Sequence, residues 1–494
     1  MQYLTILDII IITIYMIFTM GIGFYFLGRQ KTTKDYFIAS RRIPGWAMGL
    51  GLVAALVSNI TFLAFPGMAF AGDWTQFTNS FMALFVMFPI AFVIIPFYRN
   101  TISTSLYEYL EKRFGYGIRA YGAIAFILYY IARLGVIFFA LALGISTMIG
   151  CNIYLLIILL GIVTIVYTWA GGIEGVTWTD VFQGILLILG GILCLVIALF
   201  GTHESAFEIL KNACHQHKFG LGEVSFNLKR DTILVMVLYG LFQHAHNFGT
   251  DQCMIQRYLT AKTTRQAIVG GFISGIACVP VWGLFFFVGT ALWGYYKFSG
   301  DTLPTEILQK SDRVFPHFIM TQLPTGVRGL ILVALLSSAM STLSAGLNSI
   351  ATVFTGDIFN HFNPRATEKF KLMNGRISVF IAGSLSLALA LWLVTRSENI
   401  LVIYYSTLSI VGGGILGLFL LAFLTKRANI HGATIGIVAC LLVVSWASLT
   451  QNGIINMGKL NYGLHPYLIG FFGHLTIFTI GYGASIIFPV KAAN

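Results

Sequence analysis

Residues 331–350 read ILVALLSSAMSTLSAGLNSI, an apolar run that carries hydroxyl groups at helical spacing. Ser337, Ser341, Ser344 and Asn348 lie at positions i, i+4, i+7 and i+11, which is one face of an α-helix. One interpretation is close packing, because small residues let transmembrane helices approach each other. The other is a helix that offers oxygen atoms to a small hard cation such as sodium.

Charged side chains are rare along the whole chain. Of its 494 residues, 57% are hydrophobic and 10% are charged, and the mean hydropathy is +0.83. Soluble domains have about 25% charged residues, so we predict an all-α integral membrane protein that is embedded in a lipid bilayer. The net charge of +12 requires no nucleic acid partner, because Lys and Arg gather at the cytoplasmic ends of membrane helices.

A membrane helix needs about 20 apolar residues, and thirteen stretches of the sequence meet this rule. The first is expected to be a retained helix rather than a signal peptide. The long connections at 201–231 and 298–326 are expected to be loops or small surface helices. The predicted spans are 6–27, 45–71, 75–97, 118–148, 153–170, 176–200, 232–249, 267–297, 327–356, 376–395, 399–424, 431–449 and 466–489.

The distribution of Lys and Arg predicts how the chain is oriented in the membrane. With the N-terminus outside and the C-terminus in the cytoplasm, most basic residues of the short connections lie inside, and Arg257 is counted among them. The opposite orientation would invert this bias. We therefore expect an N-out, C-in topology.

Two predicted spans carry polar residues where a membrane helix is usually apolar. Ser58, Asn59 and Thr61 lie in the middle of the second span, ahead of Pro66. A proline kink explains this pattern, and so does a helix that is broken at a substrate and ion site. The span at 232–249 is similarly polar and lies five spans later, which favours two inverted five-helix repeats.

Two ionisable residues lie within predicted spans. An arginine at mid-membrane, such as Arg133, costs at least about 2.5 kcal/mol on insertion scales, so it needs a partner. The partner is either an acidic residue of another helix or, as we prefer, the carboxylate of a ligand held by the guanidinium fork. Asp180 is interpreted either as a paired or capping residue or as a cation ligand.

Missing motifs narrow the function. The sequence has no GxxxxGK[ST] phosphate loop, no Arg/Lys ladder typical of a voltage sensor and no TVGYG-like filter. We therefore expect neither an ATP-driven pump nor an enzyme, and an ion gradient is the energy source that is left. A sensor or channel with a transporter-like fold is kept as an alternative.

Several segments together resemble the sodium:solute symporter family. They are WAGGIEGVTWTDVFQG (169–184), DQCMIQRYL (251–259) and KTTKDYFIASRRIPGWAMG (31–49). Within this family the chain is most similar to bacterial sodium/sialic acid symporters, through NITFLAFPGMAF (59–70), SLYEYLEKRFG (105–115) and the intramembrane arginine. The resemblance implies a multi-pass protein of the bacterial plasma (inner) membrane.

The resemblance also implies a LeuT-type fold in a single transporter domain, 1–494. One extra helix at 6–27 would precede the first repeat, at 45–200. The second, inverted repeat would be 232–424, and two C-terminal helices would follow at 431–489.

The family's ion and substrate positions carry over to this sequence residue by residue. The first sodium site would use the carbonyls of Ala54, Val57 and Ser338 and the hydroxyls of Ser341 and Thr342. A second sodium site would use Asp180, Ser341 and Ser344, but Ala345 replaces a hydroxyl ligand there. The substrate would contact Ser58, Thr61 and Arg133, with Phe77 as an outer-gate or packing aromatic, while Leu56 and Ser80 stand where the similar transporters have Thr and Gln.

These positions imply a sodium-coupled symporter, functional as a monomer, that imports an acidic sugar by alternating access. Sialic acid (N-acetylneuraminate) is the expected substrate, with its carboxylate on Arg133. Na⁺ is the only ion implied. A sodium symporter for a neutral sugar or a small monocarboxylate is the alternative.

Overall fold

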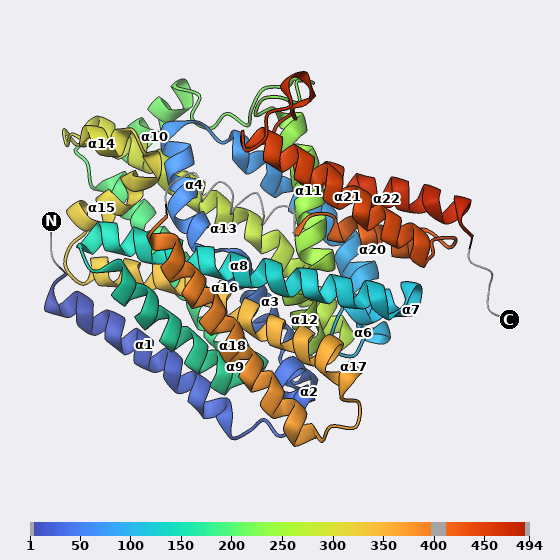
Figure 1. Ribbon diagram of the computed structural model, residues 1–494. Helices are drawn as coiled ribbons and strands as arrows, with labels where there is room; N and C mark the ends of the chain where they lie inside the picture. Colours follow the sequence, from blue (N-terminus) through green and yellow to red (C-terminus); the bar gives the residue numbers. More distant parts are fainter. Residues whose placement is uncertain (1–3, 397–411, 490–494) are drawn as a thin grey trace.

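The computed structural model describes residues 4–396 and 412–489. Long helices packed side by side make up most of it, and short helices lie in the connections between them (Figure 1). In the described residues the only β-type pairings are two isolated bridges.

Nine helical segments of the described chain are long and apolar enough to cross a membrane, and the bent pair α3–α4 makes ten. Seven of the nine are single helices: α1 Ile6–Leu27, α8 Tyr116–Ile149, α9 Ile153–Phe200, α13 Thr264–Phe298, α18 Glu368–Val394, α21 Ile430–Gln451 and α22 Leu468–Ile487. The other two each join several elements: η2 Thr75–Phe81, α5 Met82–Pro89, η3 Ile90–Ile94 and α6 Ile95–Thr101 in one, and α16 Val327–Val353, η5 Phe354–Phe359 and α17 Asn360–Phe362 in the other.

Helix α9 accounts for two of the predicted spans. It contains 48 residues, which is about 72 Å of helix for a hydrocarbon layer of about 30 Å. Gly172 interrupts it with φ 53° and ψ −162°. This break separates the spans expected at 153–170 and 176–200. Of the last core span, expected at 399–424, only α20 Ile415–Leu424 and the residues before it from 412 lie within the described residues.

The second predicted span, 45–71, is a broken helix. Of the two interpretations of its polar residues, a proline kink or a broken helix, the structure confirms the second. Helices α3 Gly45–Leu56 and α4 Asn59–Ala71 meet at an angle of 57°. The break is at Val57 and Ser58, whose backbone is extended. Pro66 lies inside α4, so the proline is not the cause of the break.

The polar span at 232–249 forms a continuous helix, α11 Ile233–Thr250. The prediction that its polar residues interrupt it is wrong. The interruption follows at Asp251, which has φ −94° and ψ 120° and caps the short helix α12 Gln252–Thr260 through its side chain. The Asp251 carboxylate accepts the Cys253 N–H, so the helix ends where a side chain can satisfy the next helix's amides.

The connections contain small helices, as expected for 201–231 and 298–326. In those two lie α10 Ala206–His215, α14 Thr305–Leu308, η4 Ser311–Arg313 and α15 Val314–Gln322. The remaining short elements are α2 Thr33–Ile38, η1 Ala39–Arg41, α7 Tyr107–Phe114 and η6 Gly458–Leu460.

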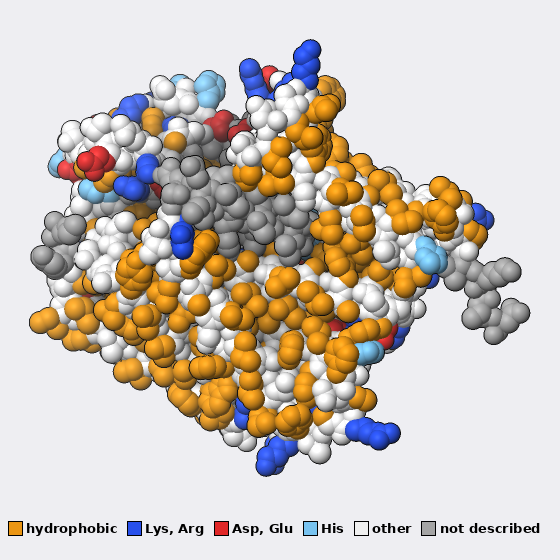
Figure 2. Space-filling view, in the orientation of Figure 1, with side chains coloured by type: hydrophobic (Ala, Val, Ile, Leu, Met, Phe, Trp, Pro, Cys, Tyr) orange, Lys and Arg blue, Asp and Glu red, His pale blue; other side chains and the backbone are white. Residues whose placement is uncertain are grey.

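The surface of the molecule is divided by side-chain type. Figure 2 shows a broad band of hydrophobic side chains on the face that it draws, with Lys and Arg gathered above and below the band. Such a band is what a lipid bilayer requires.

Helix α16, which carries the hydroxyl stripe, lies in the interior of the molecule. Every residue from Ile331 to Val353 is buried, and helices α1, α8, α9 and α18 pack around it (Figure 1). Its hydroxyl groups therefore face protein rather than lipid.

One carboxylate ties the N-terminal helix α1 to α16. Asp8 Oδ1 accepts the N–H groups of Gly326 at 2.9 Å and Gly329 at 2.8 Å, at the start of α16. Its Oδ2 accepts the N–H and the hydroxyl of Thr5, the N-cap of α1. A single buried side chain thus caps two helices.

Candidate functional site

The break between α3 and α4 lies against the middle of α16. The Ser341 hydroxyl donates to the Ala54 carbonyl at 2.9 Å and lies 3.2 Å from the Ser338 carbonyl. The Thr342 hydroxyl lies 3.3 Å from the Ala55 carbonyl and 3.2 Å from that of Ser338. The structure therefore brings together four of the five oxygen-bearing residues predicted for the first ion site.

The fifth residue, Val57, is fully buried at the end of α3, where the chain turns into α4. The Ala55 carbonyl was not predicted, although it is the α3 acceptor nearest to Thr342. Carbonyl and hydroxyl oxygens at a helix break suit a hard cation such as Na⁺. No group of three or more His, Cys, Asp or Glu side chains in the described part of the chain is arranged to hold a metal ion.

Asp180 forms a buried ion pair. Its Oδ2 lies 2.6 Å from the Arg257 guanidinium, and both side chains are fully buried. Arg257 also donates to the Cys253 carbonyl at 2.9 Å. Arg257 is therefore buried in an ion pair rather than exposed in a loop, while the side of the membrane on which it lies stays a prediction. Of the two readings of Asp180, the structure shows the paired one.

The residues of the predicted second ion site are less closely assembled. The Ser344 hydroxyl lies 3.2 Å from the Ser341 carbonyl, within the same helix. No contact between described residues joins Asp180 to either serine. Asp180 Oδ1 has no hydrogen-bond partner among the described side chains, so one acceptor atom is left over at this position.

The C-terminal end of the hydroxyl stripe pairs with α12. The Gln256 amide donates to Asn348 Oδ1 at 2.7 Å and to the Thr352 hydroxyl at 2.8 Å. Its Oε1 accepts the Ser349 hydroxyl at 2.9 Å. The stripe thus divides into a part around Ser341 that contacts the α3–α4 break and a packing part around Asn348. The packing interpretation is confirmed for the second part, and a cation site at the first part stays a prediction.

Arg133 lies half-buried on α8. Its Nη1 lies 3.5 Å from the Tyr130 hydroxyl, and the guanidinium lies 5.4 Å from the centre of the same ring. Tyr130 in turn donates to Asp251 at 2.6 Å. No carboxylate within the described residues forms an ion pair with Arg133. Most of its donors are thus available to a ligand, and Tyr130 and Asp251 are neighbours that the sequence did not reveal.

The polar residues after the break lack partners. Ser58 is the N-cap of α4 but makes no capping bond with its side chain. Thr61 is buried, and both amide atoms of buried Asn59 lack a partner among the described atoms. No contact that the structure describes joins Ser58 or Thr61 directly to Arg133. Polar groups are rarely left this way in a protein interior, which marks the start of α4 as a candidate ligand surface.

Phe77 and Ser80 lie in η2, and both are buried. The Phe77 ring packs against Trp74, Phe81 and Phe286, with centroids 5.3, 5.0 and 5.4 Å away. This environment supports the packing reading of Phe77.

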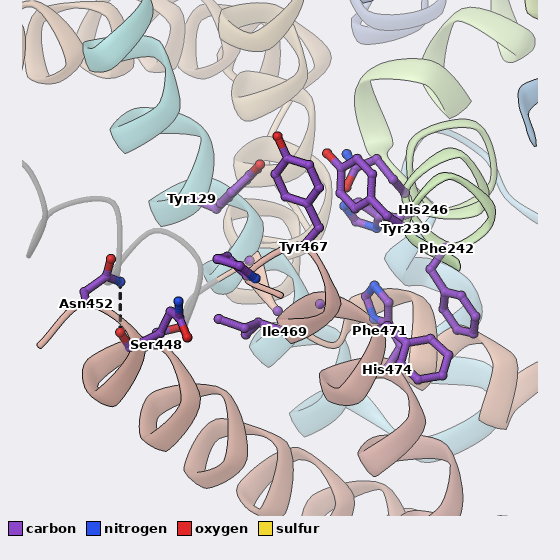
Figure 3. Close-up of a pocket in the computed structure, with 16 residues that line it drawn as sticks. Tyr129, Tyr239, Phe242, His246, Ser448, Asn452, Tyr467, Ile469, Phe471 and His474 are labelled. Carbon is purple, nitrogen blue, oxygen red and sulfur yellow. Dashed lines mark hydrogen bonds between the residues drawn. The ribbon is translucent and has the colours of Figure 1, made fainter. Parts of the chain in front are cut away.

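None of the residues discussed so far in this section lines a pocket of about 420 Å³. Its lining comes from α8, α11, the two C-terminal helices and the chain just before α20 (Figure 3). No pattern in the sequence predicts this pocket, because its lining comes from five segments that lie far apart in the chain.

Comparison with known proteins places the chain among ion-coupled transporters. Residues 36–440 match the model of the sodium:solute symporter family. The sodium/sialic acid symporter NanT of Aliivibrio fischeri is 34% identical over 94% of this chain and 90% of its own. SiaT of Proteus mirabilis, also a sodium/sialic acid symporter, is 34% identical over 86% of each chain.

Solved structures agree with this placement. A Na⁺-coupled sialic acid symporter in a substrate-bound outward-open state has a TM-score of 0.90 at 30% identity, over 99% of both chains. Mhp1, a nucleobase-cation-symport-1 family transporter, has a TM-score of 0.59 at 13% identity, over 92% of this chain and 94% of its own. The second likeness concerns the fold alone, and the two together confirm the expected LeuT-type, all-helical membrane fold.

Proposed function

Because this chain belongs to the sodium:solute symporter family and is a sodium-coupled solute symporter, we propose that it imports an acidic sugar, sialic acid. Relatives named as sodium/sialic acid symporters support this substrate. We place the chain in a bacterial inner membrane as an N-out, C-in monomer, with the repeats at 45–200 and 232–424.

The observation that carries the substrate proposal is Arg133. A guanidinium without an ion-pair partner among the described residues, inside a membrane helix, is retained at an energetic cost. A carboxylate offers it two parallel hydrogen bonds. The hydroxyls of Ser58 and Thr61 and the side chain of Ser80 are the further substrate contacts that we propose. Phe77 keeps the packing role that its aromatic neighbours support.

We assign the coupling ion to the oxygens around Ser341. The carbonyls of Ala54, Val57 and Ser338 and the hydroxyls of Ser341 and Thr342 would hold one Na⁺. The contact of Ser341 with Ala54 supports this, because the ligands come from two elements that can separate. Sodium binding would then fix α3 against α16, and its release would free them.

A second sodium at Asp180, Ser341 and Ser344 is the weaker proposal. Asp180 Oδ1 is free to accept it, but Oδ2 is engaged by Arg257, and Ala345 offers a methyl group. One sodium with one monoanion moves no net charge. A second sodium would add about 2.3 kcal/mol per 100 mV of membrane potential.

Uptake into proteoliposomes tests the proposal. Radiolabelled sialic acid, neutral sugars and short monocarboxylates are offered with an inward sodium gradient and a clamped potential. We expect sodium-dependent uptake of sialic acid against its gradient, which also excludes a channel. Uptake of only a neutral sugar or a monocarboxylate would establish the alternative instead.

Substitution of Arg133 is the sharper test. Arg133→Ala should lower sialic acid uptake at least a hundredfold, because a charged, bidentate contact is lost, and Arg133→Lys should restore only a small part of it. The control for an Arg→Lys change is Arg365→Lys, because Arg365 is exposed. Arg119 is not suitable for this control, since it forms an ion pair with Asp357. Normal uptake by Arg133→Ala would refute the carboxylate contact.

A further inference from the structure

The pocket near the C-terminal helices has the features of a second binding site. It lies where α21 ends and α22 begins, and it faces α11 on the opposite wall (Figure 3). Its volume of about 420 Å³ falls within the range of small-molecule sites, about 300–1,000 Å³. None of the described residues that line it comes from α3, α4 or α16, which carry the proposed sodium site.

Aromatic rings form much of the wall. Tyr239 and Tyr467 stack with their centroids 4.6 Å apart, and Phe242 and Phe471 meet edge to face at 4.8 Å. Each pair joins α11 to the α22 end of the pocket. Rings held in this way present flat apolar faces at a small cost in side-chain entropy.

Two residues that line the pocket carry unpaired polar atoms. The Ser448 hydroxyl and His474 Nδ1 are buried and have no hydrogen-bond partner among the described residues. Ser448 is 1% and His474 is 7% exposed. Both residues line the pocket. Buried polar atoms are nearly always hydrogen-bonded in native proteins, so the pocket holds unused capacity for a polar ligand.

Full charges are missing from this wall. The described lining residues include no Lys, Arg, Asp or Glu. An ionised ligand would leave water without a counter-charge, which is costly. Aromatic faces together with hydroxyl, amide and imidazole groups suit a ligand that has C–H faces and many hydroxyls but no charge.

We propose that this pocket binds an uncharged, polyhydroxylated molecule of the size of a hexosamine. It would be a site separate from Arg133, although both use α8: Tyr129 lines the pocket one turn before Arg133. Tyr239, Gln243 and His246 line the pocket from one face of α11. The ligand therefore bridges the C-terminal helix pair and a helix of the transport core.

Two glycines of α22 allow a matched test. An added Cβ at Gly470, which lines the pocket, meets no atom within 4 Å, and the same is true of Gly483, which does not line it. Gly470→Trp should fill the pocket without displacing the backbone. Gly483→Trp makes the same chemical change on the same helix outside the pocket.

Binding of radiolabelled N-acetyl-D-mannosamine, a neutral hexosamine, is measured on the purified full chain in nanodiscs. We expect equal affinity for the unaltered protein and Arg133→Ala, at least tenfold weaker binding to Gly470→Trp, and less than twofold change for Gly483→Trp. Ser448→Ala, a smaller change, should weaken binding about fivefold through the lost hydrogen bond. It keeps the test valid if Gly470→Trp does not fold.

Three results would overturn the proposal. They are no binding to the unaltered protein, binding that Arg133→Ala abolishes, and binding that neither Gly470→Trp nor Ser448→Ala weakens. The proposed transport function fails on different evidence, since it depends on sialic acid uptake. The two failures are therefore distinguishable.

Discussion

The Asp180–Arg257 pair, at the scale of single residues, combines two costly charges in a fully buried contact of 2.6 Å. Desolvation of the two ions offsets much of their attraction, but removing one partner leaves the other charge buried and alone. Arg257 Nε has no hydrogen-bond partner among the described residues. The pair is thus sensitive to any change that neutralises one side.

Asp180→Asn should therefore destabilise the protein by about 3–5 kcal/mol. Thermal unfolding in detergent, followed by fluorescence-detected size exclusion, measures the effect. Glu208→Gln is the control, because it removes an exposed pair with Lys211, a contact of about 0–1 kcal/mol. Equal melting temperatures for Asp180→Asn and the unaltered chain would show that the pair does not stabilise the fold.

The Thr342 hydroxyl carries a prediction about sodium. Thr342→Val keeps the shape of the side chain and removes the oxygen that lies 3.3 Å from the Ala55 carbonyl. Hydrogen bonds and contacts to charged groups contribute about 1.5–3 kcal/mol, so the sodium concentration for half-maximal uptake should rise at least tenfold.

Exposed Thr434 on α21 is the matched control for Thr342. Its hydroxyl donates only to the Ile430 carbonyl of its own helix. Thr434→Val should leave the sodium dependence unchanged. A sodium dependence that is unchanged in Thr342→Val as well would remove Thr342 from the ion site.

Single residues were predictable where their chemistry is conspicuous in an apolar chain. Arg133, Ser341 and Thr342 stand out because each is polar within a membrane span. Arg257 did not stand out, because it lies in a segment as polar as a loop. Its burial depends on Asp180, 77 residues earlier, and no local pattern reports such a pairing.

Breaks in helices decide the architecture at the scale of elements. The α3–α4 break follows Leu56 rather than Pro66, and the α11–α12 break follows the polar residues rather than dividing them. The sequence located the irregular spans correctly but not the residues at which they bend. Pro66 lies inside α4, and its backbone packs closely against Gly289 of α13, which has no side chain there.

Gly172 interrupts α9. It lies in the segment 169–184 that resembles the family, but the sequence does not show that the helix breaks at this residue. Its φ of 53° and ψ of −162° lie close to a region that only glycine occupies readily. An added Cβ would lie 2.8 Å from Tyr36 Cδ2 and 2.9 Å from the Tyr36 carbonyl oxygen. Both the backbone and the space therefore exclude a side chain.

Gly172→Ala should lower the melting temperature and the yield of folded protein. A left-handed backbone alone costs about 1–2 kcal/mol of folding free energy, and the contact with Tyr36 should make the loss larger. Gly21→Ala in α1 is the control, since its Cβ meets nothing within 4 Å and alanine favours a helix. Melting curves of both variants provide the comparison. If Gly172→Ala and Gly21→Ala have the same melting temperature, the break in α9 tolerates a side chain.

At the scale of the whole molecule, composition was enough to predict the all-helical membrane class, and the family's motifs were enough to predict the LeuT-type fold. The bounds of the two repeats stay a prediction. The structure adds how the predicted spans are connected, because two of them are joined in α9 and one is divided between α3 and α4. The C-terminal pocket was beyond the sequence for a related reason. It exists only through the docking of α21 and α22 against α11.

Orientation is tested by thiol labelling. Cys151 and Cys214 are exposed, whereas the other four cysteines are buried. With the N-terminus outside, both exposed thiols face the exterior, so a membrane-impermeant maleimide should label intact cells. In a Cys151→Ser/Cys214→Ser background, Arg365→Cys should react only after permeabilisation. The reverse pattern would mean that the chain is inserted the other way.

The shared cap at Asp8 also constrains the order of biosynthesis. Its α16 partners, Gly326 and Gly329, follow it by 318 and 321 residues. At about 5–20 residues per second, a ribosome needs roughly 16–64 s to reach them. Helix α1 is therefore made long before its partner, and Asp8 Oδ1 lacks these two hydrogen bonds until residues 326–329 have been made. Docking of α1 onto α16 through Asp8 can thus begin only after the start of α16 has been made.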